Sequence, residues 1–285
     1  MNNNINFLIR CAGEDIQKFP DISYGMRLDP KLDQQITATL KEAKNVIAIT
    51  PEVRHEYELI GIDEEKIIDI PNGVDTKKFA KSVDRKKERN RLGVGDDEFL
   101  ILSVGRNHSK KNYITLLKTA KNLLARGKTN FKILCVGRKC GELRPDVSRL
   151  GLDEFVILRD AIETLGKKEN DLSLPAQELI NIYKSADLFV FPSLTETFGV
   201  AIVEAMASGL PVLTGDSPGC RDVVGYGAWG LMCDPLDYEG FSETIIEFMD
   251  SNDLRQKFQI KSKERAKSYD WDLVVSKYIR VYEKE

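Results

Sequence analysis

The fold is decided by one stretch of the chain, which runs Leu188-Phe-Val-Phe-Pro-Ser-Leu-Thr-Glu-Thr-Phe-Gly199 and continues Val200-Ala-Ile-Val-Glu-Ala-Met-Ala-Ser-Gly-Leu-Pro-Val-Leu213. The unbroken apolar run Leu188–Phe191 predicts a strand that is covered on both faces of its sheet. The apolar run after Gly199 predicts a helix over Val200–Ser208, which Gly209 and Pro211 terminate. Because a second apolar run, Pro211–Leu213, follows directly, the stretch predicts two parallel strands joined by a crossover helix.

The same alternation extends through the whole chain. Apolar residues recur at helical spacing in several segments, for example Leu32 to Leu40, Tyr113 to Leu124 and Phe241 to Met249. Short β-branched or aromatic runs between such segments predict further strands at Asn6–Ile9, Val46–Ile49, Lys66–Ile70, Phe99–Val104, Phe131–Val136 and Val156–Leu158. The sequence therefore predicts an α/β fold with parallel sheets.

Composition excludes several classes of protein. A chain of 285 residues with 42% hydrophobic content has apolar material for two domains. Its 42 Lys and Arg against 45 Asp and Glu give a net charge of −3, which provides no general field for nucleic acid, so anion binding must be local. Five cysteines without a CxxC pair favour neither a disulfide framework nor a zinc site, and we expect no metal.

The expected location is the cytoplasm. No apolar run approaches the length of about 18 residues that a membrane span needs, and the first residues do not resemble a secretory leader. A peripheral position at the inner membrane face remains an open alternative.

The basic segment from Lys77 to Arg91 predicts the boundary between two sheets, and we interpret it as a solvated linker with a short helix rather than as a patch for an anionic partner. The expected organisation is a partial N-terminal domain over residues 1–76, a linker over 77–98, a second domain over 99–268, and a terminal helix over 269–285.

Two loops that follow strong strands contain the candidate binding groups. After Phe99–Val104, Gly105 permits close backbone approach, and Arg106 and Lys111 provide two cations that suit a diphosphate. After Leu188–Phe191, the helix that begins beyond Gly199 offers free N–H groups and the positive end of its dipole to an anion. Ligands of open α/β sheets bind at these strand ends.

Glu204 is the only charged residue of its apolar helix and therefore needs a partner. A ribose cis-diol is a suitable one, because its two O–H groups match two carboxylate oxygens. Glu196 stands eight positions earlier. A glycosidase that uses Glu196 and Glu204 as its carboxylate pair is an alternative, although it assigns no purpose to Arg106 and Lys111.

Other motifs are less specific. Gly225-Tyr-Gly-Ala-Trp-Gly230 matches GxGxxG, but no helical pattern follows it, so we interpret it as a turn. The glycine-rich loop Thr214–Val224 is either a further source of phosphate-binding N–H groups or a plain turn. His55 is expected at the surface, and a role for His108 stays open.

Taken in order, several motifs resemble the retaining glycosyltransferases of family 4 (glycosyl transferases group 1), which have the GT-B fold. These motifs are Ile70-Pro-Asn-Gly-Val-Asp75, Val104-Gly-Arg106 with Lys111, Ser185–Ser193, Glu196-Thr-Phe-Gly199 and Glu204–Val212. The segment Asp270–Tyr278 is similar to that family's closing helix, which crosses back to the N-terminal domain.

The resemblance implies a hexosyltransferase that moves a sugar from a nucleotide-sugar donor to an acceptor hydroxyl with retention, without a cofactor or metal. The expected setting is polysaccharide, lipopolysaccharide or glycoconjugate synthesis, with a glycan, a lipid-linked molecule or a small molecule as acceptor. Arg106, Lys111 and Glu196 would be catalytic; Gly105, Thr197, Phe198, Gly199, Val200 and Glu204 would bind the donor, with Glu204 on the ribose.

The chain departs from that family near its start. No early glycine-rich loop matches, and Ala12 stands before Gly13 where many members have an active-site histidine. We therefore expect a truncated product or a partner that supplies the missing strands, with an exposed sheet edge that favours association. The alternative function is a nucleotide-sugar binding module without turnover.

Overall fold

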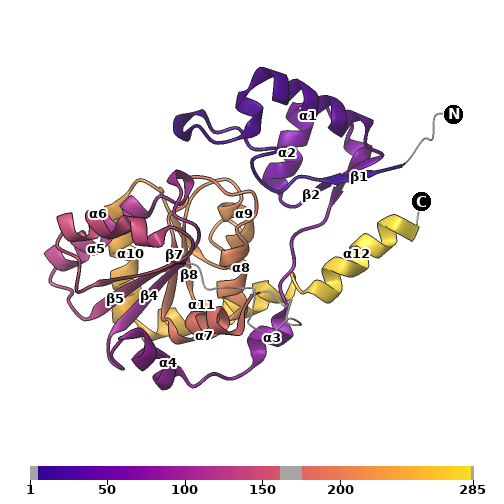
Figure 1. Ribbon diagram of the computed structural model, residues 1–285. Helices are drawn as coiled ribbons and strands as arrows, with labels where there is room; N and C mark the ends of the chain where they lie inside the picture. Colours follow the sequence, from indigo (N-terminus) through magenta and orange to yellow (C-terminus); the bar gives the residue numbers. More distant parts are fainter. Residues whose placement is uncertain (1–5, 161–174, 284–285) are drawn as a thin grey trace.

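The computed structural model describes residues 6–160 and 175–283, which form two parallel sheets (Figure 1). The first sheet has the order β1-β2-β3, from Leu8–Arg10, Asn45–Ala48 and Ile67–Asp69. The second has the order β6-β5-β4-β7-β8-β9. Its strands are β4 (Phe99–Val104), β5 (Phe131–Val136), β6 (Val156–Arg159), β7 (Leu188–Phe191), β8 (Val212–Gly215) and β9 (Leu231–Cys233). The predicted α/β class is confirmed.

The helices follow the strands as crossovers. Those attached to the first sheet are α1 (Pro30–Glu42) and α2 (Pro51–Leu59). Those attached to the second are α5 (Tyr113–Ala125), α6 (Arg144–Arg149), α7 (Gln177–Ser185), α8 (Val200–Ala207), α9 (Cys220–Val224), α10 (Tyr238–Asp250) and α11 (Asn252–Lys267). The remaining helices, α3 (Thr76–Ala80), α4 (Arg85–Leu92) and α12 (Trp271–Glu283), belong to the segments that cross between the sheets or follow them.

Both faces of the second sheet are covered, which explains its continuous apolar runs. Along β4, Leu100 and Leu102 pack into the core that includes α7, α8 and α9, whereas Ile101 packs into the core that includes α5 and α10. Successive side chains of a strand point to opposite faces, so apolar residues are favoured at consecutive positions of such a strand. The strands β4, β5 and β7 have the bounds that these runs predict.

Most basic side chains of the segment from Lys77 to Arg91 are exposed, as a solvated linker implies, and Arg89 is a buried exception. The segment contributes to α3 and forms α4, and the Arg89 side chain on α4 is only 2% exposed. The Arg89 guanidinium donates to the carbonyl of Ser185 at 3.0 Å and lies 3.1 Å from an oxygen of Asp187. A count of like charges in a sequence does not reveal that one of them is buried against carbonyls. The domain limits given above stay a prediction.

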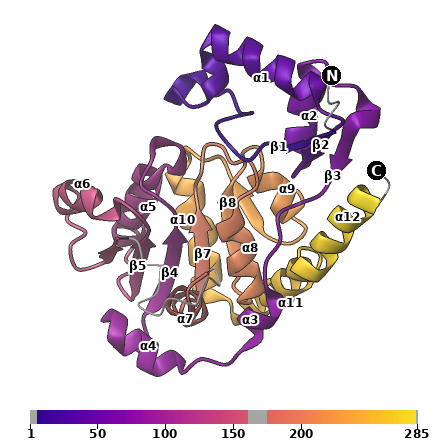
Figure 2. The same ribbon diagram turned by 45° about the vertical axis from the view of Figure 1, so that its right-hand side comes forward.

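The two segments that cross between the sheets are bonded to each other. Val74 and Asp270 form a parallel bridge, in which Val74 N–H donates to Tyr269 O at 2.8 Å and Trp271 N–H donates to Val74 O at 3.2 Å. Beyond this bridge α12 extends beside the first sheet (Figures 1 and 2), where Tyr278 and Val281 pack against the core.

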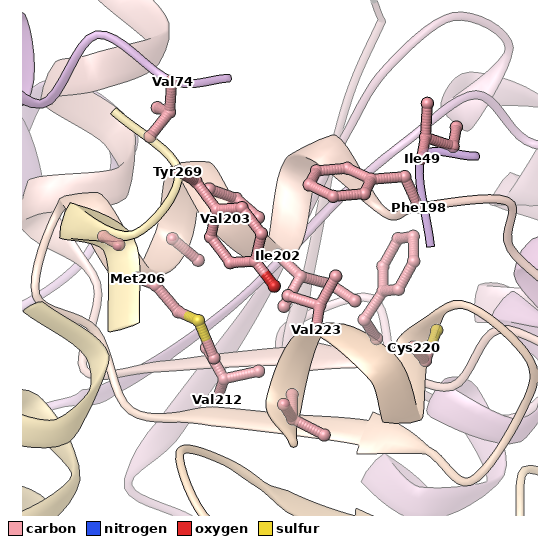
Figure 3. Close-up of a cluster of buried hydrophobic side chains, with 14 of the residues drawn as sticks. Ile49, Val74, Phe198, Ile202, Val203, Met206, Val212, Cys220, Val223 and Tyr269 are labelled. Carbon is pink, nitrogen blue, oxygen red and sulfur yellow. The ribbon is translucent and has the colours of Figure 1, made fainter. Parts of the chain in front are cut away.

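Apolar side chains fill the contact between the two halves of the molecule. Figure 3 shows Ile49 and Val74 from the first half gathered with Phe198 and Tyr269 from the second. The rings of Phe198 and Tyr269 meet edge to face with their centroids 5.3 Å apart. This geometry is favourable for aromatic pairs and ties the loop before α8 to the segment before α12.

Within the described ranges, no helix combines the length and apolar character that crossing a bilayer requires.

Candidate functional site

A cavity of about 300 Å³ lies between the two halves, at the carboxyl ends of strands from both sheets, and we call it the strand-end cavity. The nine residues predicted for the site all line it, namely Gly105, Arg106, Lys111, Glu196, Thr197, Phe198, Gly199, Val200 and Glu204. Six further residues complete the lining: Ala12, Asn72, Val104, Lys110, Phe191 and Ala201. Strand ends of the first half thus contribute to the same cavity through Ala12 and Asn72.

The loop after β4 contributes Arg106, Lys110 and Lys111 to the cavity, and it holds the two predicted cations in different ways. Gly105 N–H donates to Val136 O at 2.9 Å, and Gly105 O accepts from the Tyr113 hydroxyl at 2.9 Å, so the loop leaves the sheet in a fixed direction. The side chain of Lys111 is only 14% exposed, whereas that of Arg106 is 41% exposed and lies 3.9 Å from Glu14. Lys111 is therefore an inner cation and Arg106 a rim cation.

Glu196 neutralises the inner cation in this structure. Its carboxylate contacts the Lys111 ammonium, accepts from the Ser193 hydroxyl at 3.1 Å, and lies 3.9 Å from the Lys110 ammonium. The Lys111 ammonium also lies 4.5 Å from the centroid of the Phe191 ring. The pairing of Glu196 with Lys111 is a contact that sequence reasoning missed, because the two residues belong to loops after different strands.

The helix α8 begins at the wall of the strand-end cavity. Gly199 has a φ of +79°, a left-handed conformation that glycine adopts without steric cost, and no side chain caps the helix. A Cβ at this position would lie 2.8 Å from Cδ1 of Ile202. The first N–H groups of the helix have no intrahelical acceptor, and Val200 and Ala201 line the cavity. This end of α8 therefore suits an anion.

Glu204 has a partner that the sequence did not predict. The Tyr183 hydroxyl donates to Glu204 Oε2 at 2.9 Å, from α7 to α8. Burial raises the pKa of Glu204 to about 7, although the Tyr183 hydrogen bond acts in the opposite direction. The sequence offered little signal for this pair, because Tyr183 follows Ile180 and Ile182 in a helix that buries all three. A carboxyl that is half-protonated near neutral pH and lines a cavity is available to a ligand hydroxyl.

Gln17 holds the loop between Ser193 and Gly199 from the first half of the molecule. Its side-chain amide donates to the Thr195 hydroxyl at 3.0 Å and accepts from the Thr197 hydroxyl at 3.1 Å. The Thr50 hydroxyl donates to Thr197 O at 2.9 Å. These buried bonds fix the residues on both sides of Glu196, and nothing in a single unaligned sequence indicates them.

The loop Thr214–Val224 is hydrogen-bonded to the loop that contains Ser193 and Glu196, and it does not line the strand-end cavity. The Ser217 hydroxyl donates to Ser193 O at 2.7 Å, and Glu196 N–H donates to Pro218 O at 3.0 Å. Of the two interpretations left open, the structure favours the turn. The GxGxxG match at Gly225–Gly230 is likewise a turn, which leads from α9 to β9.

The two histidines lie outside the strand-end cavity. His108 Nδ1 accepts from Lys110 N–H at 3.3 Å, and its ring meets Tyr24 edge to face. The side chain of His55 is 61% exposed, as expected.

Glu196 and Glu204 have separate partners, a lysine and a tyrosine, which gives no support to a carboxylate pair. In the described parts of the chain, no three His, Cys, Asp or Glu side chains are placed to hold a metal ion.

Comparison with known proteins agrees with this geometry. The family model for glycosyl transferases group 1 matches residues 84–265, so the chain belongs to that family. It is 30% identical over 244 residues to the D-inositol 3-phosphate glycosyltransferase of Nocardia farcinica, a match that covers 84% of this chain and 51% of that protein. It is also 30% identical over 235 residues to the phosphatidyl-myo-inositol mannosyltransferase of Mycolicibacterium smegmatis, covering 81% and 54%. The chain thus spans about half the length of these relatives.

Solved structures confirm the GT-B fold. The complex of Anabaena HepE with UDP-glucose superposes with a TM-score of 0.80 at 20% identity, covering 98% of this chain and 71% of that one. The sucrose-phosphate synthase of Thermosynechococcus elongatus superposes with a TM-score of 0.81 at 21% identity, covering 99% and 68%.

Proposed function

We propose that the strand-end cavity binds a nucleoside-diphosphate sugar and that the protein transfers its sugar to an acceptor hydroxyl with retention of anomeric configuration. One observation above all supports this proposal. Three cations, a helix N-terminus and a carboxyl whose pKa burial raises, from the segments that follow two different strands, line a single cavity. That Anabaena HepE was solved with UDP-glucose agrees with it.

The diphosphate takes the place that Glu196 now occupies beside Lys111. Its charge competes for the Lys111 ammonium, and the N–H groups at the start of α8 provide a second set of donors. Arg106 at the rim adds a bidentate contact. As the bond to the sugar breaks, negative charge grows on the diphosphate, and these preorganised groups stabilise it.

The released Glu196 carboxylate becomes available to the hydroxyls of the donor sugar. Ser193 still donates to it, and the bonds from Gln17 to Thr195 and Thr197 keep its loop in place. Phe198 and Thr197 form the adjacent wall of the cavity. Glu196 thus changes partners when the donor enters, from the Lys111 ammonium to the sugar.

Glu204 binds the ribose. Two ribose hydroxyls donate to its carboxylate, and this favours the ionised form over the proton that burial retains. Tyr183 fixes the orientation of the carboxylate by donating to one of its oxygens. The acceptor is a hydroxyl of a phosphorylated polyol or glycan, which agrees with the names of the inositol phosphate and phosphatidylinositol relatives.

Calorimetric titration with the diphosphates of uridine, guanosine and adenosine, and then with their sugars, tests the proposal. We expect one diphosphate and its sugar to bind, and we expect an added acceptor to release free diphosphate and yield a product with the donor's anomeric configuration by NMR. Failure of all three diphosphates to bind would overturn the proposal. Donor binding without release of diphosphate, across a panel of acceptors, would instead identify a binding module.

A further inference from the structure

A second cavity lies near the opposite end of α8 from Gly199. It has a volume of about 400 Å³ and is formed by α3, the end of α7, the end of α8 and α11, which come together in both ribbon views (Figures 1 and 2). Lys184, Lys263 and Lys267 line it together with Thr76 and Ser208, and the rest of the lining is Phe79 and alanines. Among the described residues, no carboxylate lines it. We call it the lysine cavity.

The three lysines have no acidic partner among the described residues. Elsewhere basic side chains next to this region are paired, such as Lys77, which lies 2.7 Å from Asp272. Lys184 is half-buried, and burial together with the nearby charge of Lys263 lowers its pKa. The Lys263 side chain lies across Gly209, where a Cβ would be 2.4 Å from Lys263 Cε. The like charges of Lys184 and Lys263 thus lie near each other, and neither has an acidic partner among the described residues.

Lysines near helix ends often serve to stabilise terminal carbonyl groups. Here backbone N–H groups already bond those carbonyls. At the end of α8, Glu204 O accepts from Ser208 N–H at 3.0 Å and Met206 O accepts from Gly209 N–H at 2.9 Å. At the end of α11, Ala266 O accepts from Tyr269 N–H at 3.0 Å. The capping role therefore does not account for three cations from two helices at one concave surface.

We propose that the lysine cavity binds a small anion that bears a phosphate group, either inorganic phosphate or a sugar phosphate. Ammonium groups recognise phosphate as point charges, and an anion of this kind would relieve the repulsion between Lys184 and Lys263. The apolar part of the lining, Phe79 with its neighbouring alanines, leaves room for a carbon skeleton attached to the phosphate. The site is distinct from the strand-end cavity and does not depend on the function proposed for it.

The position of the lysine cavity gives such an anion a structural consequence. Thr76 follows Val74 closely and Lys267 precedes Asp270, and Val74 and Asp270 form the bridge between the two crossing segments. A bound anion therefore contacts both segments near their bridge. Because it binds only the folded protein, it also raises the melting temperature.

Titration of the intact chain with inorganic phosphate and with a hexose monophosphate, in a zwitterionic buffer of low ionic strength, tests the proposal by phosphorus NMR and thermal unfolding. We expect saturable binding of at least one ligand, weakened at least tenfold in the Lys184→Gln, Lys263→Gln, Lys267→Gln variant. The matched control replaces Lys31, Lys118 and Lys121 with Gln, three exposed lysines at unrelated positions, and should bind like the unmodified chain.

Lys111→Gln separates the two cavities and should leave this binding intact. Absence of saturable binding, an equal loss in the matched control, or a loss confined to Lys111→Gln would each overturn the proposal. If the triple variant does not fold, Lys263→Gln alone, at an exposed position, should still weaken binding about threefold, and no weakening would overturn the proposal as well.

Discussion

The hydroxyl of Tyr183 donates to the carboxylate of Glu204 at 2.9 Å, and this bond joins the helix before β7 to the helix after it. The pair lies at the boundary between the apolar core and the strand-end cavity, since Tyr183 is fully buried and Glu204 lines the cavity. The orientation of the Glu204 carboxylate in the cavity wall is thus set from within the core.

Glu204→Gln should change stability and donor binding in opposite directions at high pH. The pKa of Glu204 is raised from its ordinary value near 4.5 to about 7, so between these values the folded state retains a proton that the unfolded state releases. The contribution of this group to stability is therefore complete below about pH 4.5 and is lost as the pH rises through about 7. We expect the variant to melt higher than the unmodified chain at pH 8, and this advantage should shrink toward pH 5.

The same variant should bind the donor more weakly and without the pH dependence of the unmodified chain, whose affinity should rise between pH 6 and pH 8. Calorimetry and thermal unfolding at both pH values measure these effects. Glu264→Gln, at an exposed position on α11, is the control. A pH dependence of donor affinity that persists in Glu204→Gln would contradict the assignment.

Lys111→Gln should weaken nucleoside diphosphate binding by at least about tenfold, because it removes a charge-assisted contact in a mostly buried position. Arg106→Gln should have a smaller effect that decreases further at high salt, since this side chain is 41% exposed. Lys118→Gln, on the exposed side of α5, controls for the change of net charge. The reverse order of effects would contradict the division into an inner and a rim cation.

Gly199→Ala should destabilise the protein and weaken donor binding together. The substitution places a Cβ at φ +79° and 2.8 Å from Cδ1 of Ile202. Gly127→Ala is a close control, because Gly127 has φ +77° and open space around its missing Cβ. We expect Gly127→Ala to cost about 1 kcal/mol of unfolding free energy from the backbone alone. Gly199→Ala should cost more, by chemical denaturation, and only it should reduce donor affinity.

Gln17→Leu should reduce donor affinity although Gln17 does not line the strand-end cavity. The substitution leaves the buried hydroxyls of Thr195 and Thr197 without their side-chain partner, at about 1 to 3 kcal/mol for an unsatisfied buried group. Combining it with Thr195→Val and Thr197→Val should recover part of the stability, because all the polar groups are then removed together. Donor affinity that stays at the unmodified value in Gln17→Leu would show that the loop needs no support from the first half.

The sequence predicted the strands of the second sheet except β9, and the nine residues proposed from it for the site line one cavity, although their roles stay a prediction. Runs such as Leu188–Phe191 are apolar at every position because both faces are buried, and that property is local. Parallel strands also place their carboxyl ends at one edge, so residues after β4 and β7 could be expected to meet.

Pairings between distant elements were not accessible in this way. That Lys111 meets Glu196, that Tyr183 meets Glu204, and that Gln17 holds two threonines depend on how helices and loops pack. The burial of Arg89 was missed for the same reason, since its acceptors are carbonyl groups that every residue possesses. The chemistry of a side chain indicates which groups can bind or ionise, whereas tertiary packing determines which partner each group has in the folded protein.

The bridge between Val74 and Asp270 has a mechanical consequence. Two strands of backbone pass from one half of the molecule to the other, and the hydrogen bonds of the bridge join them along a single line. Two halves connected in this manner rotate about the line of the bridge more easily than they slide or twist relative to each other. A rotation that widened the space between the halves would also have to break the buried bonds from Gln17 to Thr195 and from Thr50 to Thr197, so these contacts oppose separation.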